Sequence, residues 1–283
     1  MKAEIIHTNR FYYETAVEQS LNSFRLKPKT DELQRLLSYR ADINPASTTA
    51  QQVDIWGNNV ETFFIAQSHQ YLEIKTTSII SVQRSPIIDH LDYTTEMKRI
   101  FHSELFQNQY LASLKQTPYT SISFDQAEKV VTEVGDASNP LVFSKNLMSY
   151  LFEKFTYDTD ATDVNTQANT VIESMRGVCQ DYAHVMLGIL RSQKIPARYV
   201  SGYLYVGEDS ALIGDAASHA WVEIMAPGIG WIGLDPTNNV EALENHIIVC
   251  TGRDYADVSP VEGVYRGGGQ SLDVSVGVRL LEK

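Results

Sequence analysis

The chain has few features that would tie it to export, disulfide bonding or a membrane. Only two of its 283 residues are cysteines, Cys179 and Cys250. Two cysteines are too few for a disulfide framework, so we expect reduced thiols, although a single bridge between them stays possible. No apolar run is long enough to cross a bilayer, and Met1–His7 does not resemble the apolar region of a signal peptide. We therefore expect a cytoplasmic protein.

Positive charge is also scarce. The chain carries 23 lysines and arginines against 35 acidic residues, which gives a net charge of −12. An acidic protein repels phosphate backbones and anionic lipid, so we expect neither a nucleic acid nor a membrane as a partner. The oligomeric state cannot be derived from these features.

The length and hydrophobic content indicate two domains. With 43% hydrophobic residues, 283 residues can bury more core than one ordinary domain. Residues 1–88 contain strand-length segments between turn residues at 15–27, 31–43 and 71–82, and 54–65 forms a hairpin pattern around Gly-Asn-Asn. We expect an antiparallel β-sandwich over 1–88, followed over 89–283 by a helical connector and a catalytic core.

The second part of the chain is predicted to contain helices followed by strands. Apolar residues at helical spacing predict helices over 93–114, 141–155 and 165–175, and another from Cys179 to Gln193. The period then changes to two, which predicts the strands 198–206, 218–225, 230–234, 246–250 and 272–280. This order is typical of an α+β fold, and we assign all five strands to the second domain.

The helix that starts at Cys179 carries the first chemical signal. Its apolar positions, Tyr182, Val185, Met186 and Ile189, lie on one face, and the cysteine stands where that face begins. Free N–H groups and the helix dipole favour an anion at this end, so a thiolate would be stabilised there. This is the requirement for a nucleophilic cysteine, whereas a core thiol gains nothing from it.

A cysteine nucleophile needs a base and a group that orients the base. His219 heads the extended segment 218–223, and Asp235 closes the segment 230–235. The short connection 226–229 makes these segments a hairpin, and its register places the imidazole and the carboxylate side by side, within about one residue. Strand alternation puts Trp221 on the face of His219, where it could shield the pair from water.

Several stretches together resemble the bacterial transglutaminase-like family, part of the papain-like Cys-His-Asp superfamily. They are Arg176–His184 (RGVCQDYAH), Ile195–Tyr203 (IPARYVSGY), His219–Glu223 (HAWVE), Gly230–Asn238 (GWIGLDPTN) and Gly252–Val258 (GRDYADV). The resemblance implies a papain-like transglutaminase core, with helices packed on an antiparallel sheet or barrel, preceded by a β-sandwich.

The resemblance also implies roles for these residues. Cys179 is the expected nucleophile, His219 the general base and then acid, and Asp235 the residue that orients His219. A protein or peptide amide is the expected substrate, and a thioester the intermediate. Substrate or oxyanion contacts are expected from Tyr157, Gln180, Tyr203 and Trp221. Animal members of the family use calcium, but no loop here aligns with theirs, so we expect no metal and no cofactor.

Other interpretations of these residues remain. His184 lies about 500° further round the helix than Cys179, so we interpret it as a structural histidine rather than the base. Cys179, His184 and His219 could suggest zinc, but no second cysteine or histidine pair supports it. Cys250 fits a core thiol. For function, we expect amide hydrolysis by a peptidase or deamidase. Transamidation with an amine acceptor is the alternative, and a non-catalytic peptide-binding module is the third hypothesis.

Overall fold

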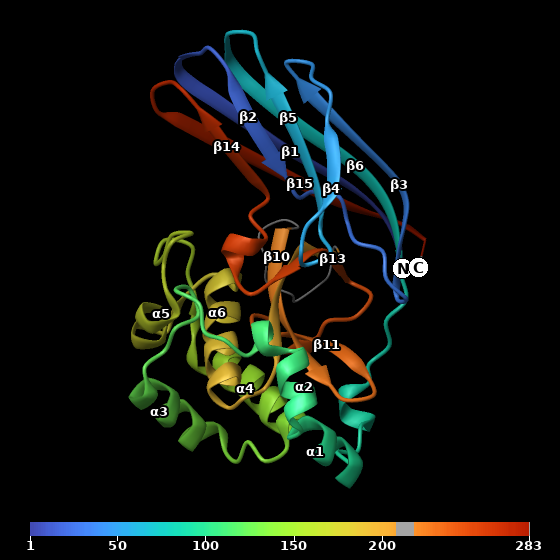
Figure 1. Cartoon of the computed structure of the whole chain (residues 1–283), viewed down its shortest axis with the longest axis vertical. Helices are drawn as coiled ribbons and strands as arrows, with labels where there is room; N and C mark the ends of the chain where they lie inside the picture. The colour runs from blue at the N-terminus through green and yellow to red at the C-terminus, as the bar shows by residue number, and fades with distance from the viewer. Residues whose placement is uncertain (208–217, 283) are drawn as a thin grey trace.

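The computed structural model describes residues 1–207 and 218–282. A β-sandwich forms one end of the molecule, and a five-stranded sheet with its helices forms the other (Figure 1). The expected α+β class, with antiparallel sheets, is confirmed. Among the described residues no helix has both the length and the apolar character that a bilayer crossing requires.

The sandwich is built from two four-stranded sheets. The first has the order β15 (Gln270–Glu282), β1 (Lys2–Val17), β6 (His69–Val82), β3 (Gln34–Asn44). The second has the order β14 (Val261–Tyr265), β2 (Ser20–Phe24), β5 (Asn59–Ile65), β4 (Ala50–Val53). Alternate residues of the strands point between the sheets, and Phe11, Phe24 and Phe63 form much of the core there. The expected hairpin is present, with Val53 opposite Asn59.

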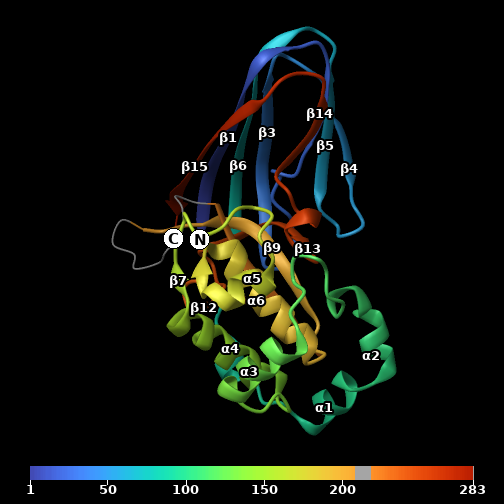
Figure 2. The same cartoon turned by 90° about the vertical axis from the view of Figure 1, so that its left-hand side faces the viewer.

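The strand predicted over 272–280 was assigned to the wrong sheet. β15 pairs along its length with β1, and β14 pairs with β2, so the last two strands complete the sandwich. The alternating pattern identified a half-buried strand correctly, but such a pattern fits the edge of either sheet. The sandwich therefore combines the beginning and the end of the chain, and Figure 2 shows the two termini close together.

The connector and the core contain six α-helices within the described residues. They are α1 (Thr95–Phe101), α2 (Glu104–Gln109), α3 (Phe124–Val134), α4 (Pro140–Lys154), α5 (Ala168–Ser174) and α6 (Cys179–Ser192). The single helix expected over 93–114 is interrupted, because Ser103 leaves the helix and caps α2 through its hydroxyl. α3 was not predicted, although Ser123 and Gln126 form a capping box at its start. Short 3₁₀ turns lie at Ile88–His90, Leu111–Ser113 and Tyr255–Asp257.

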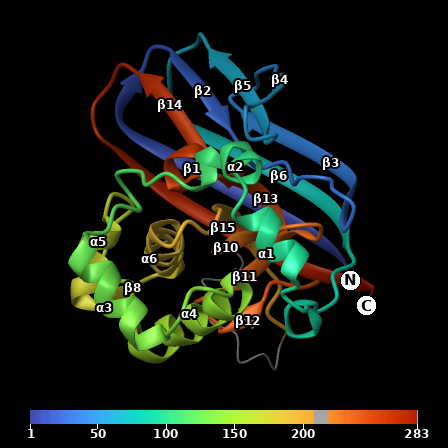
Figure 3. The same cartoon turned by 60° about the horizontal axis from the view of Figure 1, so that its bottom comes forward.

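α6 is the central helix of the core. It contacts α3, α4 and α5 as well as two strands of the sheet (Figure 3). All residues from Gln180 to Arg191 are buried, so the helix is enclosed on every side rather than on one apolar face. Its polar residues need partners there, and Arg191 donates to Thr120 and to two backbone carbonyls.

The five-stranded sheet of the core is antiparallel. Its order is β12 (Val240–Glu241), β11 (Gly230–Asp235), β10 (Ser218–Ala226), β9 (Ala197–Leu204), β13 (His246–Gly252). Four of these strands were predicted, and β12 is a two-residue addition. The two-stranded ladder of β7 (Thr156–Tyr157) and β8 (Arg176–Gly177) leads into α6.

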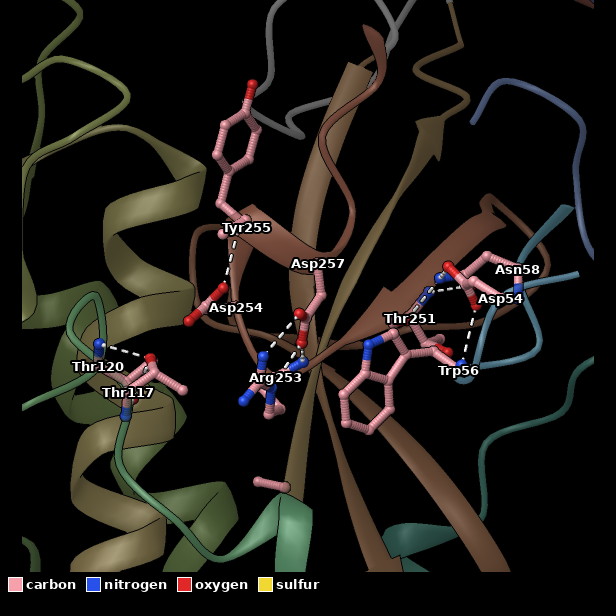
Figure 4. A network of polar contacts seen from close by, with 12 residues as sticks. Asp54, Trp56, Asn58, Thr117, Thr120, Thr251, Arg253, Asp254, Tyr255 and Asp257 are labelled. Atoms are coloured by element: carbon pink, nitrogen blue, oxygen red, sulfur yellow. Dashed lines mark hydrogen bonds and ion pairs between the residues drawn. The ribbon is translucent and has the colours of Figure 1, made fainter. Parts of the chain in front are cut away.

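Side-chain amides of the sandwich cover the edge of this sheet. Asn58 both donates to and accepts from the backbone of Thr251, and Gln34 does the same with Ile248. Each amide thus takes the place of a neighbouring strand on β13. Figure 4 shows Asn58 against Thr251, with Arg253 paired to Asp257 nearby. These contacts attach the sandwich to the five-stranded sheet.

Candidate active site

Cys179 occupies the first position of α6, as expected, and its side chain is half-buried. Asp181 holds this end of the helix. Its Oδ2 accepts the backbone N–H of Val178 at 2.8 Å and the hydroxyl of Thr162 at 2.6 Å. The first N–H groups of a helix have no partner within it, so they are free to stabilise charge at the thiol. Both cysteines are free thiols, and no bridge joins them.

His219 and Asp235 meet at the sheet edge. His219 Nε2 lies 2.7 Å from Asp235 Oδ2, and both side chains are buried. The register differs from the expected one. Ala226 pairs with Gly230, which makes Trp221 the residue opposite Asp235 and leaves His219 on the diagonal. A turn one residue longer than assumed causes this shift, and diagonal neighbours on one face are still within reach of an imidazole.

Asp235 is held by more than one donor. Its Oδ1 accepts the backbone N–H groups of Thr237 and Asn238, at 3.0 and 3.3 Å. Its Oδ2 also accepts from the Asn238 side chain at 2.8 Å. A carboxylate with this many donors is fixed in orientation and favoured in its charged form.

The electrostatics of the pair follow from these contacts. Burial alone would lower the pKa of His219, but the charge and hydrogen bond of Asp235, joined by those of Cys179, raise it from 6.5 to about 10. Burial would raise the pKa of Asp235, but His219 and His246 together move it far below its usual value. Because Nε2 of His219 contacts Asp235, the nitrogen that remains for the thiol is Nδ1. A charged thiolate and an imidazolium would stabilise each other in this arrangement.

A second histidine, not predicted from the sequence, lies at the site. His246 Nε2 lies 3.0 Å from the same Oδ2 of Asp235, and the residue is 2% exposed. Burial lowers the pKa of His246 despite the neighbouring carboxylate, so its neutral ring donates Nε2–H to Asp235. His246 begins β13, which pairs with β9 and with neither hairpin strand. No local spacing pattern could have linked it to Asp235.

His219, Asp235 and His246 also form a group of three possible metal ligands, all buried, among the residues that the structure describes. Zinc would hold nitrogen and oxygen ligands at about 2.0–2.2 Å from a common centre. Here both Nε2 atoms instead contact the carboxylate directly, at 2.7 and 3.0 Å. The arrangement fits two imidazole N–H donors on one acceptor better than ligands around an ion.

Trp221 packs against both histidines. Its ring is stacked on His219, with centroids 6.1 Å apart, and meets His246 edge-on at 5.1 Å. At 1% exposure it covers the His219–Asp235 pair with an apolar wall, which matches the shielding expected from strand alternation. A dry environment strengthens the charge interactions beside it.

The other three expected contact residues have different surroundings. Tyr157 pairs with Gly177 in the β7–β8 ladder, two residues from Cys179. Gln180 follows the cysteine, is buried, and donates to the carbonyl of Val164. Tyr203 lies elsewhere: it is 3% exposed and bonds to His7 of the sandwich at 2.8 Å. Its hydroxyl therefore joins the two parts of the molecule rather than facing a substrate.

The two residues interpreted as structural are buried. His184 accepts the backbone N–H of Tyr255 and packs between Tyr119 and Tyr199, and burial lowers its pKa to about 3. Cys250 is fully buried, and burial raises its pKa to about 12. A thiol in that state is inert, so Cys179 is the reactive candidate of the two.

Comparison with known proteins agrees with this architecture. Residues 128–236 match the transglutaminase-like superfamily, and residues 3–81 match the bacterial transglutaminase-like N-terminal region. The chain is 31% identical over 285 residues to an uncharacterized protein of Mycobacterium leprae, covering 99% of both chains. The chain belongs to the transglutaminase-like superfamily, as its motifs indicated.

Two further relatives are informative. A solved structure from Cytophaga hutchinsonii, described provisionally as a cysteine protease, superimposes with a TM-score of 0.77 at 20% identity, over 100% of this chain and 91% of that one. A protein-glutamine gamma-glutamyltransferase of Pseudomonas aeruginosa is 34% identical over 90 residues, which is 30% of this chain and 14% of that protein. Family and fold together support cysteine-based acyl transfer by an enzyme.

Proposed function

We propose that this protein hydrolyses protein or peptide amides through Cys179, His219 and Asp235, as a peptidase or deamidase. The contact of His219 with Asp235 at 2.7 Å carries the proposal, because it fixes the imidazole and keeps it protonated beside the cysteine. We further propose that the reaction takes place in the cytoplasm.

In the proposed reaction the Cys179 thiolate attacks the amide carbonyl carbon, and a carbon–sulfur bond forms. The oxyanion is stabilised by the backbone N–H of Cys179 at the start of α6 and by a second donor, for which Tyr157 is our candidate. The His219 imidazolium then gives its proton to the departing nitrogen, the carbon–nitrogen bond breaks, and a thioester remains.

Water completes the cycle. His219, now neutral, takes a proton from the water that attacks the thioester, and the carbon–sulfur bond breaks. The thiolate, the imidazolium and a carboxylic acid product result. Throughout both halves Asp235 stabilises the charged imidazole and holds the ring.

Labelling with iodoacetamide tests the proposed site. We expect Cys179 to be labelled stoichiometrically, while the buried Cys250 is not labelled in the folded protein. Labelling should be faster than that of a model thiol at neutral pH, and His219→Ala should slow it. Labelling at the rate of a model thiol, unaffected by His219→Ala, would instead favour a non-catalytic binding module.

Transamidation is the second candidate, supported by the partial match to the glutamyltransferase. It uses the same three residues, and an amine in place of water attacks the thioester. A peptide-library assay with and without a primary amine separates the two. Cleavage or ammonia release that the amine does not change indicates hydrolysis, whereas incorporation of the amine into glutamine-containing peptides indicates transamidation.

A further inference from the structure

β15 is an unpaired edge of the sandwich. It is 13 residues long and pairs on one side with β1, while no other strand of the described residues pairs with its second side. Figure 2 shows it along the margin of the sandwich. A long edge strand presents a row of free N–H and C=O groups that can accept another strand.

The inner face of this edge is apolar and only partly covered. Leu272, Val274, Val276, Val278 and Leu280 alternate along the strand with polar or small residues. Val276 and Val278 pack against the core, but Leu272 and Val274 are 52% and 48% exposed. An added strand would cover these two side chains.

The outer face carries rows of charge that run across the strands. In one row Arg10 bonds to Glu73 at 2.8 Å on one side and to Asp273 at 3.1 Å on the other. In a second row Arg279 bonds to Glu4 at 2.8 Å. The end members, Asp273 and Arg279, are 57% and 71% exposed, so each row stops at the edge with a charge that can take another partner.

We propose that β15 pairs with β15 of a second copy of this chain, antiparallel and about a two-fold axis at Val276. Asp273 and Arg279 lie three residues on either side of Val276, so this register places Asp273 opposite Arg279 of the other copy, twice. It also places Val274 opposite Val278, and Leu272 opposite Leu280.

The pairing extends each row of charge with alternating sign. The first would run Glu73, Arg10, Asp273 and then continue into Arg279 and Glu4 of the second copy. Opposite charges on facing residues stabilise a strand pair, and like charges destabilise it. One strand from each copy buries less area than a standard interface, so we expect a weak dimer whose formation depends on concentration.

Charge reversal tests the register. Sedimentation velocity over a concentration series should show the wild-type dimer. In a dimer of Asp273→Arg, positions 273 and 279 of the two copies both carry arginine at each of the two facing pairs. In a dimer of Arg279→Asp, both positions carry a carboxylate. Each variant should raise the dimer dissociation constant by about tenfold. Mixed together, the two variants are complementary at both pairs, so the mixture should form a heterodimer close to wild type in affinity.

Lys75→Asp is the matched control. It makes the same charge change as Arg279→Asp on an exposed position of the central strand β6 and should leave the dissociation constant unchanged. A wild-type protein that stays monomeric at its highest soluble concentration overturns the proposal. An unchanged dissociation constant in either single variant also overturns it. A mixture that fails to form the heterodimer, although both variants keep the wild-type circular dichroism, overturns it as well. None of these readouts depends on the proposed catalysis.

Discussion

Two buried histidines of the core around α6 show what an acidic neighbour does to an imidazole. His219 and His184 are 4% and 0% exposed, so burial acts on both. His219 contacts Asp235, and its pKa rises to about 10. His184 accepts a backbone N–H, lies near the positive Arg191, and its pKa falls to about 3. At His219 the charge and hydrogen bond of Asp235 outweigh the effect of burial, whereas at His184 burial dominates and the charge of Arg191 adds to it.

The consequences for function differ accordingly. His184 stays neutral and supports the loop that follows β13, whereas His219 can hold a proton beside a thiolate. We therefore interpret His184 as a structural histidine and propose His219 for proton transfer. Changing the partner, rather than the histidine, is the sharpest way to test this difference.

Asp235→Ala should have the largest effect. Without the carboxylate, burial dominates at His219 as it does at His184, and the imidazolium is lost. We expect kcat to fall by about 10³- to 10⁴-fold. Iodoacetamide labelling of Cys179 should become slow at neutral pH. A variant that keeps kcat within tenfold of wild type would show that Asp235 does not control His219.

His246→Leu should have the next largest effect. It removes one donor from Asp235, so the carboxylate is held less firmly. We expect kcat to fall by about tenfold to a hundredfold, as for the loss of one hydrogen bond to a charged group. His246→Gln can donate from a similar position and should restore most of the activity. The His7→Gln variant, at a buried histidine bonded to Tyr203, is the control and should retain wild-type kcat. Equal losses in the Leu and Gln variants would contradict the assigned hydrogen bond.

The three residues proposed as a triad could be singled out from the sequence because each has a local signal. Cys179 opens a helix, and His219 and Asp235 belong to one hairpin. His246 had no such signal, because its strand joins the sheet on the far side of β9. Hairpin partners follow from a short turn, but a strand added across the sheet is placed by tertiary packing alone.

In the fold, too, the elements set by local sequence could be predicted, and those placed by contacts between distant segments could not. The helix at 141–155 and the strands around 198–234 were predicted from periodicity and end signals. The position of β15 was not, because its partner β1 lies at the other end of the chain. The burial of Gln180–Arg191 on all sides was also missed, since spacing identifies an apolar face but cannot show that polar residues have buried partners.

The pH dependence of stability should separate the two kinds of histidine. The folded pKa values of His184 and His7, about 3 and 4, lie below the ordinary 6.5. The unfolded chain therefore binds more protons as the pH falls below 6.5, and each group costs roughly 1.4 kcal/mol per pH unit. His219 acts in the opposite sense: its contribution is complete below 6.5 and is lost as the pH rises towards 10.

Urea unfolding at pH 7 and pH 5 measures this difference. Wild type should lose stability on acidification, and His184→Gln should recover about 2 kcal/mol of that loss. His90→Gln, at an exposed position, is the control. An unchanged loss in His184→Gln would mean that His184 takes up its proton without unfolding.

The smallest expected effect concerns the hydrogen bond that His184 makes. Its Nε2 accepts the backbone N–H of Tyr255 at 3.2 Å. At pH 8, where no proton uptake intervenes, His184→Leu leaves that partly buried N–H without an acceptor and should lower the free energy of unfolding by about 1 kcal/mol. His184→Gln offers a carbonyl oxygen instead and should lose less. Both variants should keep kcat within twofold of wild type, because His184 has no contact with the triad. A loss of kcat as large as that in His246→Leu would contradict the proposed difference in role between His184 and His219.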